Sequence, residues 1–388
     1  MKMVISIFIF LAGFFILTFL LGKVFEKAKI PWIFSALIIG ALLALKNPFT
    51  NITDSPEFSF LSQLGMFFLL FVIGFEIDLK KIRKIAGFIV GSTFFIILTE
   101  ALFGTIVIHF IFGYDWFISL IVGTSFATVG EAILLPILDK AKMINTKLGQ
   151  TILGVGTFDD IFEIAILVIL VLFLGAKSAG VSQNYFAITI GALFFLFILT
   201  IAFIKLKTRN EKFSVYNIET LFLLSIAVLF LFIGIGEFAN STALAALLAG
   251  ISLKTFIPEK RIKGIESEVR SLCYGFFAPI FFLSVGLALS VKYLVSSPGL
   301  VLLVFCVSAA SKLIASYIAG KKKLGARNSI LLGIGLSVRF STSIVIVKIL
   351  LDNNLIKEGL YTVIIASSIL FTLIIPLLFS YLISKQKK

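Results

Sequence analysis

The chain has 388 residues, of which 60% are hydrophobic and 14% are charged, and its mean hydropathy is +1.14. This balance excludes a water-soluble globular domain and predicts a polytopic membrane protein in contact with the lipid bilayer. The formal net charge of +14 does not indicate a nucleic-acid partner, because the basic residues concentrate in alternate loops.

Windows of about twenty apolar residues predict about thirteen transmembrane helices and an all-α fold. The first window is longer than the apolar part of a signal peptide and no small-residue cleavage site follows it, so we expect a retained helix. In chain order the helices are expected at 3–22, 30–46, 58–77, 85–112, 114–139, 146–175, 184–206, 216–238, 241–257, 268–290, 297–320, 326–351 and 357–383.

The loops between these helices alternate between basic and nearly uncharged. One set of loops, with the C-terminal tail, holds 26 Lys and Arg residues, whereas the opposite set holds 6. The positive-inside rule therefore predicts a multi-pass protein of the cytoplasmic membrane, with its N-terminus outside and its C-terminus in the cytoplasm.

The two halves of the chain resemble each other at an offset of about 212 residues. Phe71–Lys80 is similar to Leu283–Lys292, and Gly123–Gly130 falls over Gly335–Thr342. Six predicted helices precede the segment 184–206 and six follow it, so an odd linker helix would make the two repeats inverted in the membrane. This is the architecture of secondary transporters, in which the binding site lies at the midplane between the repeats.

Two predicted helices contain residues that weaken a helix at mid-depth. The segment 114–139 contains Gly123–Gly130, and the segment 326–351 contains Gly333–Thr342. Glycine favours a break, and nearby hydroxyl groups can satisfy the freed backbone groups. We expect two crossed, discontinuous helices that aim their half-helix ends at one point. The alternative is close helix packing through small residues.

Two adjacent acids, Asp159 and Asp160, lie in the otherwise apolar stretch Leu148–Leu174. Carboxylates at this depth are costly and typically functional. A pair can hold a cation, or take up protons when the cation leaves. The two side chains differ by about 100° around the helix axis, so one can meet a fixed cation while the other faces water. Lys312 is the expected fixed cation.

Further charges are expected inside the membrane. Arg339, in the second break, needs a carboxylate, and Glu131 and Glu100 are the candidates for a structural ion pair. By the repeat offset, Glu100 occupies the position of Lys312 in the other half. Glu163 lies one turn beyond the aspartates and either lines an aqueous funnel or extends the ion site.

Together these residues resemble the monovalent cation:proton antiporters, in particular the Kef-type sodium/proton exchanger family with an Asp-Asp motif. The resemblance covers nearly the whole chain, although Kef-like members often have Arg-Gly-Glu where this chain has Arg339-Phe340-Ser341. The resemblance rests on the segments 71–78, 124–129, 158–160, 279–287 and 336–339, together with Lys312.

The resemblance implies a homodimer with a dimerisation domain and a mobile core. The dimerisation domain would comprise 1–80 and 211–293, and the core would comprise 81–176 and 294–388, joined by a linker helix at 177–210. It also implies that Asp160 binds the ion and that Asp159 pairs with Lys312. Members with two aspartates are usually electrogenic.

We therefore expect a secondary transporter, not an enzyme, that exchanges Na⁺, or Li⁺, for H⁺ by competitive alternating access without a cofactor. Na⁺ would bind at Asp160 and Asp159, with help from Thr128 and Ser125, since oxygen ligands suit a hard cation. A K⁺/H⁺ antiporter or K⁺ efflux transporter is equally compatible with the motifs. A sodium-coupled organic-anion symporter would share the fold. An intramembrane aspartyl protease is disfavoured because it needs carboxylates from separate helices.

Overall fold

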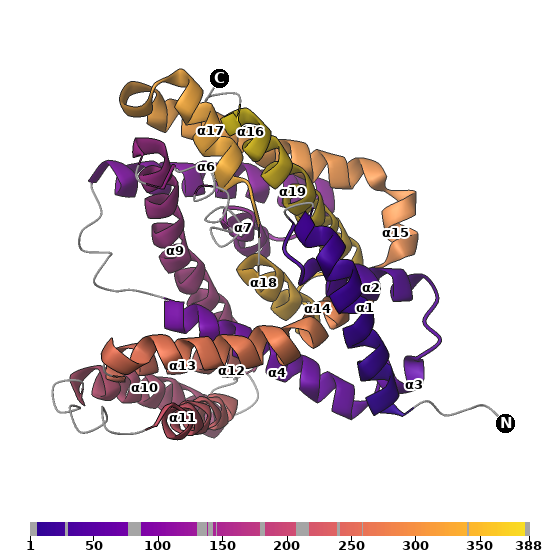
Figure 1. The fold of residues 1–388 in the computed structure, drawn as a ribbon, viewed down its shortest axis with the longest axis vertical. Coiled ribbons are helices and arrows are strands. Elements are labelled where there is room, and N and C mark those ends of the chain that lie inside the picture. Colours follow the sequence, from indigo (N-terminus) through magenta and orange to yellow (C-terminus); the bar gives the residue numbers. More distant parts are fainter. Residues whose placement is uncertain are drawn as a thin grey trace. The chain divides into compact units, whose positions relative to one another are not determined.

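The computed structural model describes most of the chain (Figure 1), namely residues 6–27, 30–76, 87–129, 138, 143–144, 146–178, 183–206, 217–238, 241–257, 259–339 and 341–384. These residues form helices and no strand. Helices suit a bilayer because they satisfy their own backbone polar groups. Each of the predicted segments overlaps a helix of the structure, so the all-α polytopic fold is confirmed.

The helix boundaries follow the apolar segments closely. In chain order they are α1 (Ile7–Lys27), α2 (Phe34–Leu45), α3 (Thr50–Thr53), α4 (Pro56–Glu76), α6 (Gly87–Phe112), α7 (Trp116–Ser125), α9 (Lys147–Ser178), α10 (Gln183–Leu206), α11 (Ile218–Phe238), α12 (Thr242–Phe256), α13 (Glu259–Leu272), the π-helical turn η3 (Cys273–Phe277), α14 (Ala278–Leu287), α15 (Val291–Ser296), α16 (Pro298–Leu324), α17 (Ala326–Leu336), α18 (Ser341–Asp352) and α19 (Glu358–Ser384). Within the described residues, seven helices are long and apolar enough to cross a bilayer, and four shorter apolar helices accompany them.

One predicted boundary is wrong by about a third of a helix. The segment expected at 268–290 begins at Glu259, because the charged helix α13 continues through η3 into α14. A hydropathy window excludes α13, whose sequence is EKRIKGIESEVRSL. Its pattern is amphipathic rather than apolar, and this pattern is the signal for a helix that leaves the hydrocarbon region.

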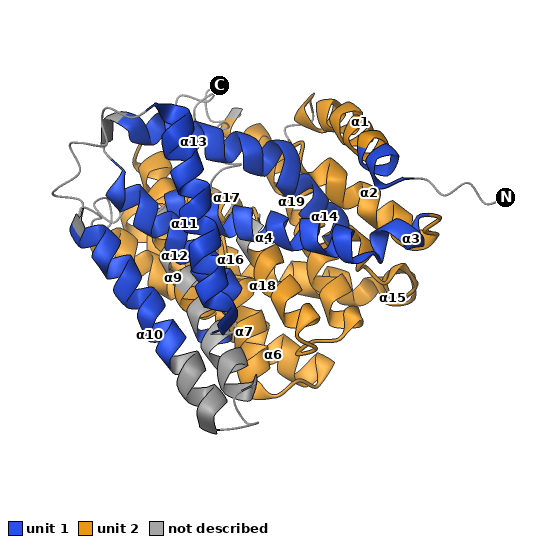
Figure 2. Cartoon of the chain, turned by 90° about the horizontal axis from the view of Figure 1, so that it is seen from below, with its two compact units in different colours: residues 1–11, 49–78, 167–284 blue, residues 12–48, 79–166, 285–388 orange. Residues whose placement is uncertain are grey.

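The contacts divide the chain into two compact units (Figure 2). Unit 1 comprises 1–11, 49–78 and 167–284, and unit 2 comprises 12–48, 79–166 and 285–388. Each unit takes segments from both halves of the sequence. The assignment of a dimerisation domain and a mobile core, with the boundaries given above, stays a prediction.

Unit 1 is packed around α12, which is buried on nearly every side. Small residues bring α4 against it: a side chain at Gly74 would meet the backbone of Gly250, whose Cα lies 3.1 Å from the ideal Cβ position. The ring of Phe68 on α4 stacks on Phe277 of η3 at 4.5 Å between centroids. Such close backbone contact is the usual way for helices to associate in lipid.

Unit 2 contains the residues of both predicted breaks. Its apolar core combines the first turns of α9 with α17 and α19, through residues such as Ile152, Leu332 and Phe379. Beside this core, α6 and α16 pack against each other, α6 packs against α7, and α16 packs against α17. These four helices position the buried charges.

Candidate functional site

Two helices of unit 2 end inside the protein at equivalent repeat positions. The helix α7 ends at Ser125 and α17 ends at Leu336, which gives an offset of 211 residues (336 − 125). After α17 the chain is non-helical at Ser337–Arg339 and resumes as α18 at Ser341. The break in the second helix is therefore confirmed. After α7 the chain is non-helical through Val129, and 130–137 lie outside the described residues.

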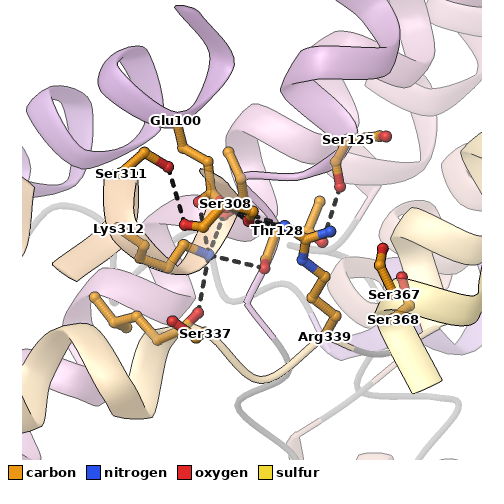
Figure 3. Close-up of polar contacts among 12 residues, drawn as sticks. Glu100, Ser125, Thr128, Ser308, Ser311, Lys312, Ser337, Arg339, Ser367 and Ser368 are labelled. Carbon is orange, nitrogen blue, oxygen red and sulfur yellow. Dashed lines mark hydrogen bonds and ion pairs between the residues drawn. The ribbon is translucent and has the colours of Figure 1, made fainter. Parts of the chain in front are cut away.

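The side chain of Lys312 joins the two breaks (Figure 3). Its ammonium donates to the carbonyl oxygens of Ala127 at 3.0 Å, Thr128 at 3.3 Å and Leu336 at 2.9 Å. The last carbonyls of a helix lack intrahelical partners and carry partial negative charge. One fully buried cation thus binds two carbonyls of the non-helical segment after α7 and the last carbonyl of α17.

Glu100, on α6, is the carboxylate beside Lys312. Its Oε2 atom lies 3.0 Å from the Lys312 ammonium, and its Oε1 atom lies 3.0 Å from Nη2 of Arg339. The hydroxyl of Ser308, one helical turn before Lys312 on α16, contacts both Glu100 Oε1 and Arg339 Nη2. All four side chains are at most 4% exposed. Glu100 therefore shares its charge between two buried cations (Figure 3).

Aromatic rings enclose Arg339. Its guanidinium carbon lies 5.0 Å from the ring centroid of Phe126 and 4.6 Å from that of Phe371, within the range of cation–π attraction. The hydroxyl of Thr372 donates to the Arg339 carbonyl at 2.9 Å. These contacts hold Arg339 as part of the packed core, and its assignment to a structural role stays a prediction.

Asp159 contacts the break from the opposite direction. Its Oδ2 atom accepts a hydrogen bond of 2.6 Å from the backbone amide of Val129, and the residue is 1% exposed. Thr128 and Val129 share one peptide group. Lys312 therefore binds the carbonyl end of that peptide and Asp159 binds its N–H end. From the two hydrogen-bond lengths and the covalent geometry of a peptide, the ammonium and the carboxylate oxygen are at most about 8.5 Å apart.

Two hydroxyl residues proposed as ion ligands lie at the same break. Ser125 donates its hydroxyl proton to the Val122 carbonyl at 2.7 Å, and Thr128 donates to the Ser125 carbonyl at 3.3 Å. These bonds satisfy carbonyls that the helix end leaves free, as the sequence suggested. A hydroxyl that donates still has lone pairs to offer a cation. The role of Ser125 and Thr128 as ligands stays a prediction.

Glycines explain why α6 and α7 approach closely enough to place Glu100 at the breaks. A Cβ atom at Gly104 would lie 2.9 Å from Cα of Gly123, and one at Gly123 would lie 2.8 Å from the Ala101 carbonyl oxygen. Gly104 is four residues after Glu100 and therefore lies on the same helix face. The close approach along this face directs the Glu100 side chain to Lys312.

The structure brings together most of the charges singled out by the sequence, but with different partners. Arg339 pairs with Glu100, one of its two candidates, while Glu131 and the side chains of Asp160 and Glu163 lie outside the described residues. Lys312 was expected to pair with Asp159, and the carboxylate at ion-pair distance here is that of Glu100. The direct pairing of Lys312 with Asp159 stays a prediction.

Ser308 contacts the charged cluster and was not predicted from the sequence. A serine is ordinary in a transmembrane helix, because it can bond to its own backbone. The available signal was its spacing of four residues before Lys312, which places both on one face of α16.

Two helices that end at a shared buried, charged centre, in a protein whose described residues are helical and include apolar spans, are the arrangement of a secondary transporter. Residues 11–385 match the model of the family described as "Sodium/hydrogen exchanger, transmembrane". The chain belongs to this family.

Two similar proteins agree with this assignment over more than nine tenths of the chain. The chain is 24% identical over 385 residues to a Na⁺/H⁺ antiporter of Enterococcus hirae, covering 93% of this chain and 94% of that protein. It is 27% identical over 375 residues to the probable Na⁺/H⁺ antiporter 3 of Methanocaldococcus jannaschii, covering 94% and 93%. It is also 26% identical over 267 residues to the glutathione-regulated potassium-efflux protein KefC of Shigella flexneri, which covers 68% of this chain but 42% of that protein.

The fold has a counterpart among solved structures. The sodium proton antiporter MjNhaP1 of Methanocaldococcus jannaschii, determined at pH 8, superposes with a TM-score of 0.67 over 98% of both chains at 18% identity. This likeness confirms the antiporter fold expected from the sequence.

Proposed function

We propose that this protein exchanges Na⁺ for H⁺ across the cytoplasmic membrane, with Asp159 and Asp160 as the site that binds them in turn. The observation that carries the proposal is the balance of buried charge. Among the described residues, the fully buried charges are two carboxylates, Glu100 and Asp159, and two cations, Lys312 and Arg339. Asp160, the next residue of α9, adds a third carboxylate to the same helix turn. For these five side chains alone, one monovalent cation restores neutrality.

Competition follows from this balance. Excess negative charge in a low-dielectric interior is strongly unfavourable, so the aspartates hold either a metal ion or protons. Na⁺ replaces the protons on one side of the membrane, and protons replace Na⁺ on the other. One proton in place of one Na⁺ keeps this balance. The electrogenic exchange that the resemblance implies for an Asp-Asp motif requires a second proton on the return step, so that both aspartates are protonated and each cycle moves one net positive charge.

The backbone of the breaks contributes oxygen ligands and mobility to this mechanism. Carbonyl oxygens and the hydroxyls of Ser125 and Thr128 complete the shell that a hard cation requires. Because Asp159 bonds to the Val129 amide, binding at the aspartates is linked to the backbone of the first break. Movement of this break would open the site to one side at a time.

The names of the relatives support Na⁺ as the cation. Two relatives that match over nearly their full length are a Na⁺/H⁺ antiporter and a probable Na⁺/H⁺ antiporter. The second candidate is K⁺/H⁺ exchange or K⁺ efflux. The similarity to KefC supports it, but that similarity covers only 42% of the relative. A homodimer, an N-terminus outside the cell and the absence of a cofactor are further parts of the proposal.

The decisive experiment measures proton flux in proteoliposomes. The purified protein is reconstituted with a preset pH gradient and a fluorescent pH probe, and NaCl, LiCl and KCl are added in turn, with protein-free liposomes as the control. Na⁺ should dissipate the gradient, whereas choline chloride should not. A response to K⁺ alone would replace Na⁺/H⁺ with K⁺/H⁺ exchange. A gradient that none of the three cations dissipates would overturn the proposal.

A further inference from the structure

Glu100 lies outside the aspartate pair, yet among the described residues it is the carboxylate at ion-pair distance from the buried lysine. An ammonium group has three N–H donors, and Lys312 directs its three to the carbonyls of Ala127, Thr128 and Leu336. Among the described residues, Glu100 Oε2 has no hydrogen bond of its own and contacts the ammonium as an ion pair at 3.0 Å. The attraction to Glu100 is therefore electrostatic, and it adds to the three hydrogen bonds that fix the ammonium.

The side chain of Glu100 is itself fixed. Arg339 and Ser308 both hold Oε1, so the carboxylate can turn only if two buried contacts break. A buried charge that loses its partner is strongly unfavourable, so rearrangement of this cluster is unfavourable too. Glu100 is thus a rigid anchor for Lys312.

The anchor matters because Lys312 and Asp159 are near each other. They bind opposite ends of the peptide group between Thr128 and Val129, so the ammonium lies at most about 8.5 Å from the Asp159 carboxylate. A free ammonium at this distance would be attracted to the aspartates and would compete there with a metal cation. A lysine side chain has enough rotatable bonds to make the move.

We propose that Glu100 is a positioning residue that holds the Lys312 ammonium away from Asp159 and thereby sets the apparent Na⁺ affinity of the exchange site. This inference rests on the proposed function and deepens it. In this arrangement the lysine binds carbonyl oxygens at the two breaks and does not compete with Na⁺ at the aspartates. Loss of the Glu100 charge would release Lys312 to the aspartates.

The test compares Glu100→Gln, which removes the charge but keeps the shape, with the wild-type protein in the same liposome assay. The KM for Na⁺ should rise about tenfold. This is the low end of the loss in metal affinity that follows when a residue supporting a metal ligand is removed. The maximal rate should fall less than twofold. Glu100→Asp keeps the carboxylate with a shorter stem, and it should give an intermediate KM.

Thr99→Val serves as the matched control, because Thr99 bonds to the Phe95 carbonyl of its own helix; its KM should equal that of the wild type.

Na⁺ binding without transport gives an independent readout. The Na⁺ concentration that raises the melting temperature in detergent should increase about tenfold in Glu100→Gln, since a ligand stabilises the folded state according to its affinity. A wild-type KM and a wild-type stabilisation curve in Glu100→Gln would overturn the inference. If Glu100→Gln does not fold, Glu100→Asp decides: a KM raised threefold or more supports the inference, and an unchanged KM refutes it. Absence of flux in the wild type would instead refute the proposed function.

Discussion

Lys312 and Asp159 bind the two ends of a single peptide group, the one that links Thr128 to Val129. A peptide at a helix break has a free carbonyl and a free amide, and in lipid both must find partners. Here a cation takes the carbonyl and an anion takes the amide. The break is therefore stabilised by the same pair of charged residues that the sequence assigns to transport, and a change of charge at Asp159 also changes the support of the backbone.

The repeat explains where the third member of the cluster comes from. Glu100 and Lys312 are equivalent residues of the two halves, separated by 212 positions (312 − 100), and their charged atoms are 3.0 Å apart. Residues related by an approximate two-fold axis meet only if they lie near that axis. The Glu100–Lys312 pair therefore marks the interface between the repeats, where inverted-repeat transporters bind their ions.

Asp160→Asn should reduce Na⁺-driven proton flux to the level of protein-free liposomes. The substitution removes the carboxylate whose charge the transported cation balances, and an amide does not take up a proton in its place. The measurement is dissipation of a preset pH gradient by NaCl. Asp54→Asn, in an exposed loop, is the matched control and should retain exchange. Full Na⁺-dependent flux in Asp160→Asn would refute the assignment of the site.

Asp159→Asn should weaken Na⁺ binding and electrogenicity together. An asparagine oxygen can still accept from the Val129 amide, so we expect a folded protein, but one carboxylate of the site is lost. The KM for Na⁺ should rise about 10- to 100-fold. The response of the exchange rate to a membrane potential imposed with valinomycin and K⁺ should shrink. An unchanged response to the potential would count against a proton-carrying role for Asp159.

The sequence predicted the helices, the second break and four of the charges that are buried in the structure, but not all of their partners. Hydropathy and glycine positions are local signals, and they located the breaks at Ser125 and Leu336 within a few residues. Lys312 was recognised as a fixed cation, whereas its contact with Glu100 depends on how α6 rotates against α16, which is a property of packing. Local patterns do not encode that rotation. The three carbonyls that Lys312 binds could not be predicted from the sequence either, because only the folded breaks bring them together.

Competition between Na⁺ and protons predicts the pH dependence of the Na⁺ KM. Na⁺ binding is linked to proton release. At a pH below the pKa of the site, each proton that must leave before Na⁺ binds therefore raises the KM for Na⁺ about tenfold for every unit by which the pH is lowered. A site where both aspartates release protons gives a slope of log KM against pH between −1 and −2, and one proton gives −1. The measurement is KM at half-unit intervals from pH 6 to 8.5. A KM that is constant with pH, with only the maximal rate changing, would exclude direct competition.

Gly104→Ala tests whether the close approach of α6 and α7 supports the charged cluster. The new methyl group would lie 2.9 Å from Cα of Gly123 and 2.9 Å from Cδ2 of Phe126, closer than packed atoms tolerate. Relief requires α6 to move away from α7, and Glu100 lies one turn away on the same helix. We expect a loss of about 1–3 kcal/mol in stability, the usual cost of overpacking, seen as a lower melting temperature in detergent.

Gly91→Ala on the same helix is the control, because its Cβ would meet no atom within 4 Å. It should keep or slightly increase the melting temperature, since alanine favours helix more than glycine does. Equal melting temperatures for the two variants would show that the Gly104 contact does not hold Glu100 in place.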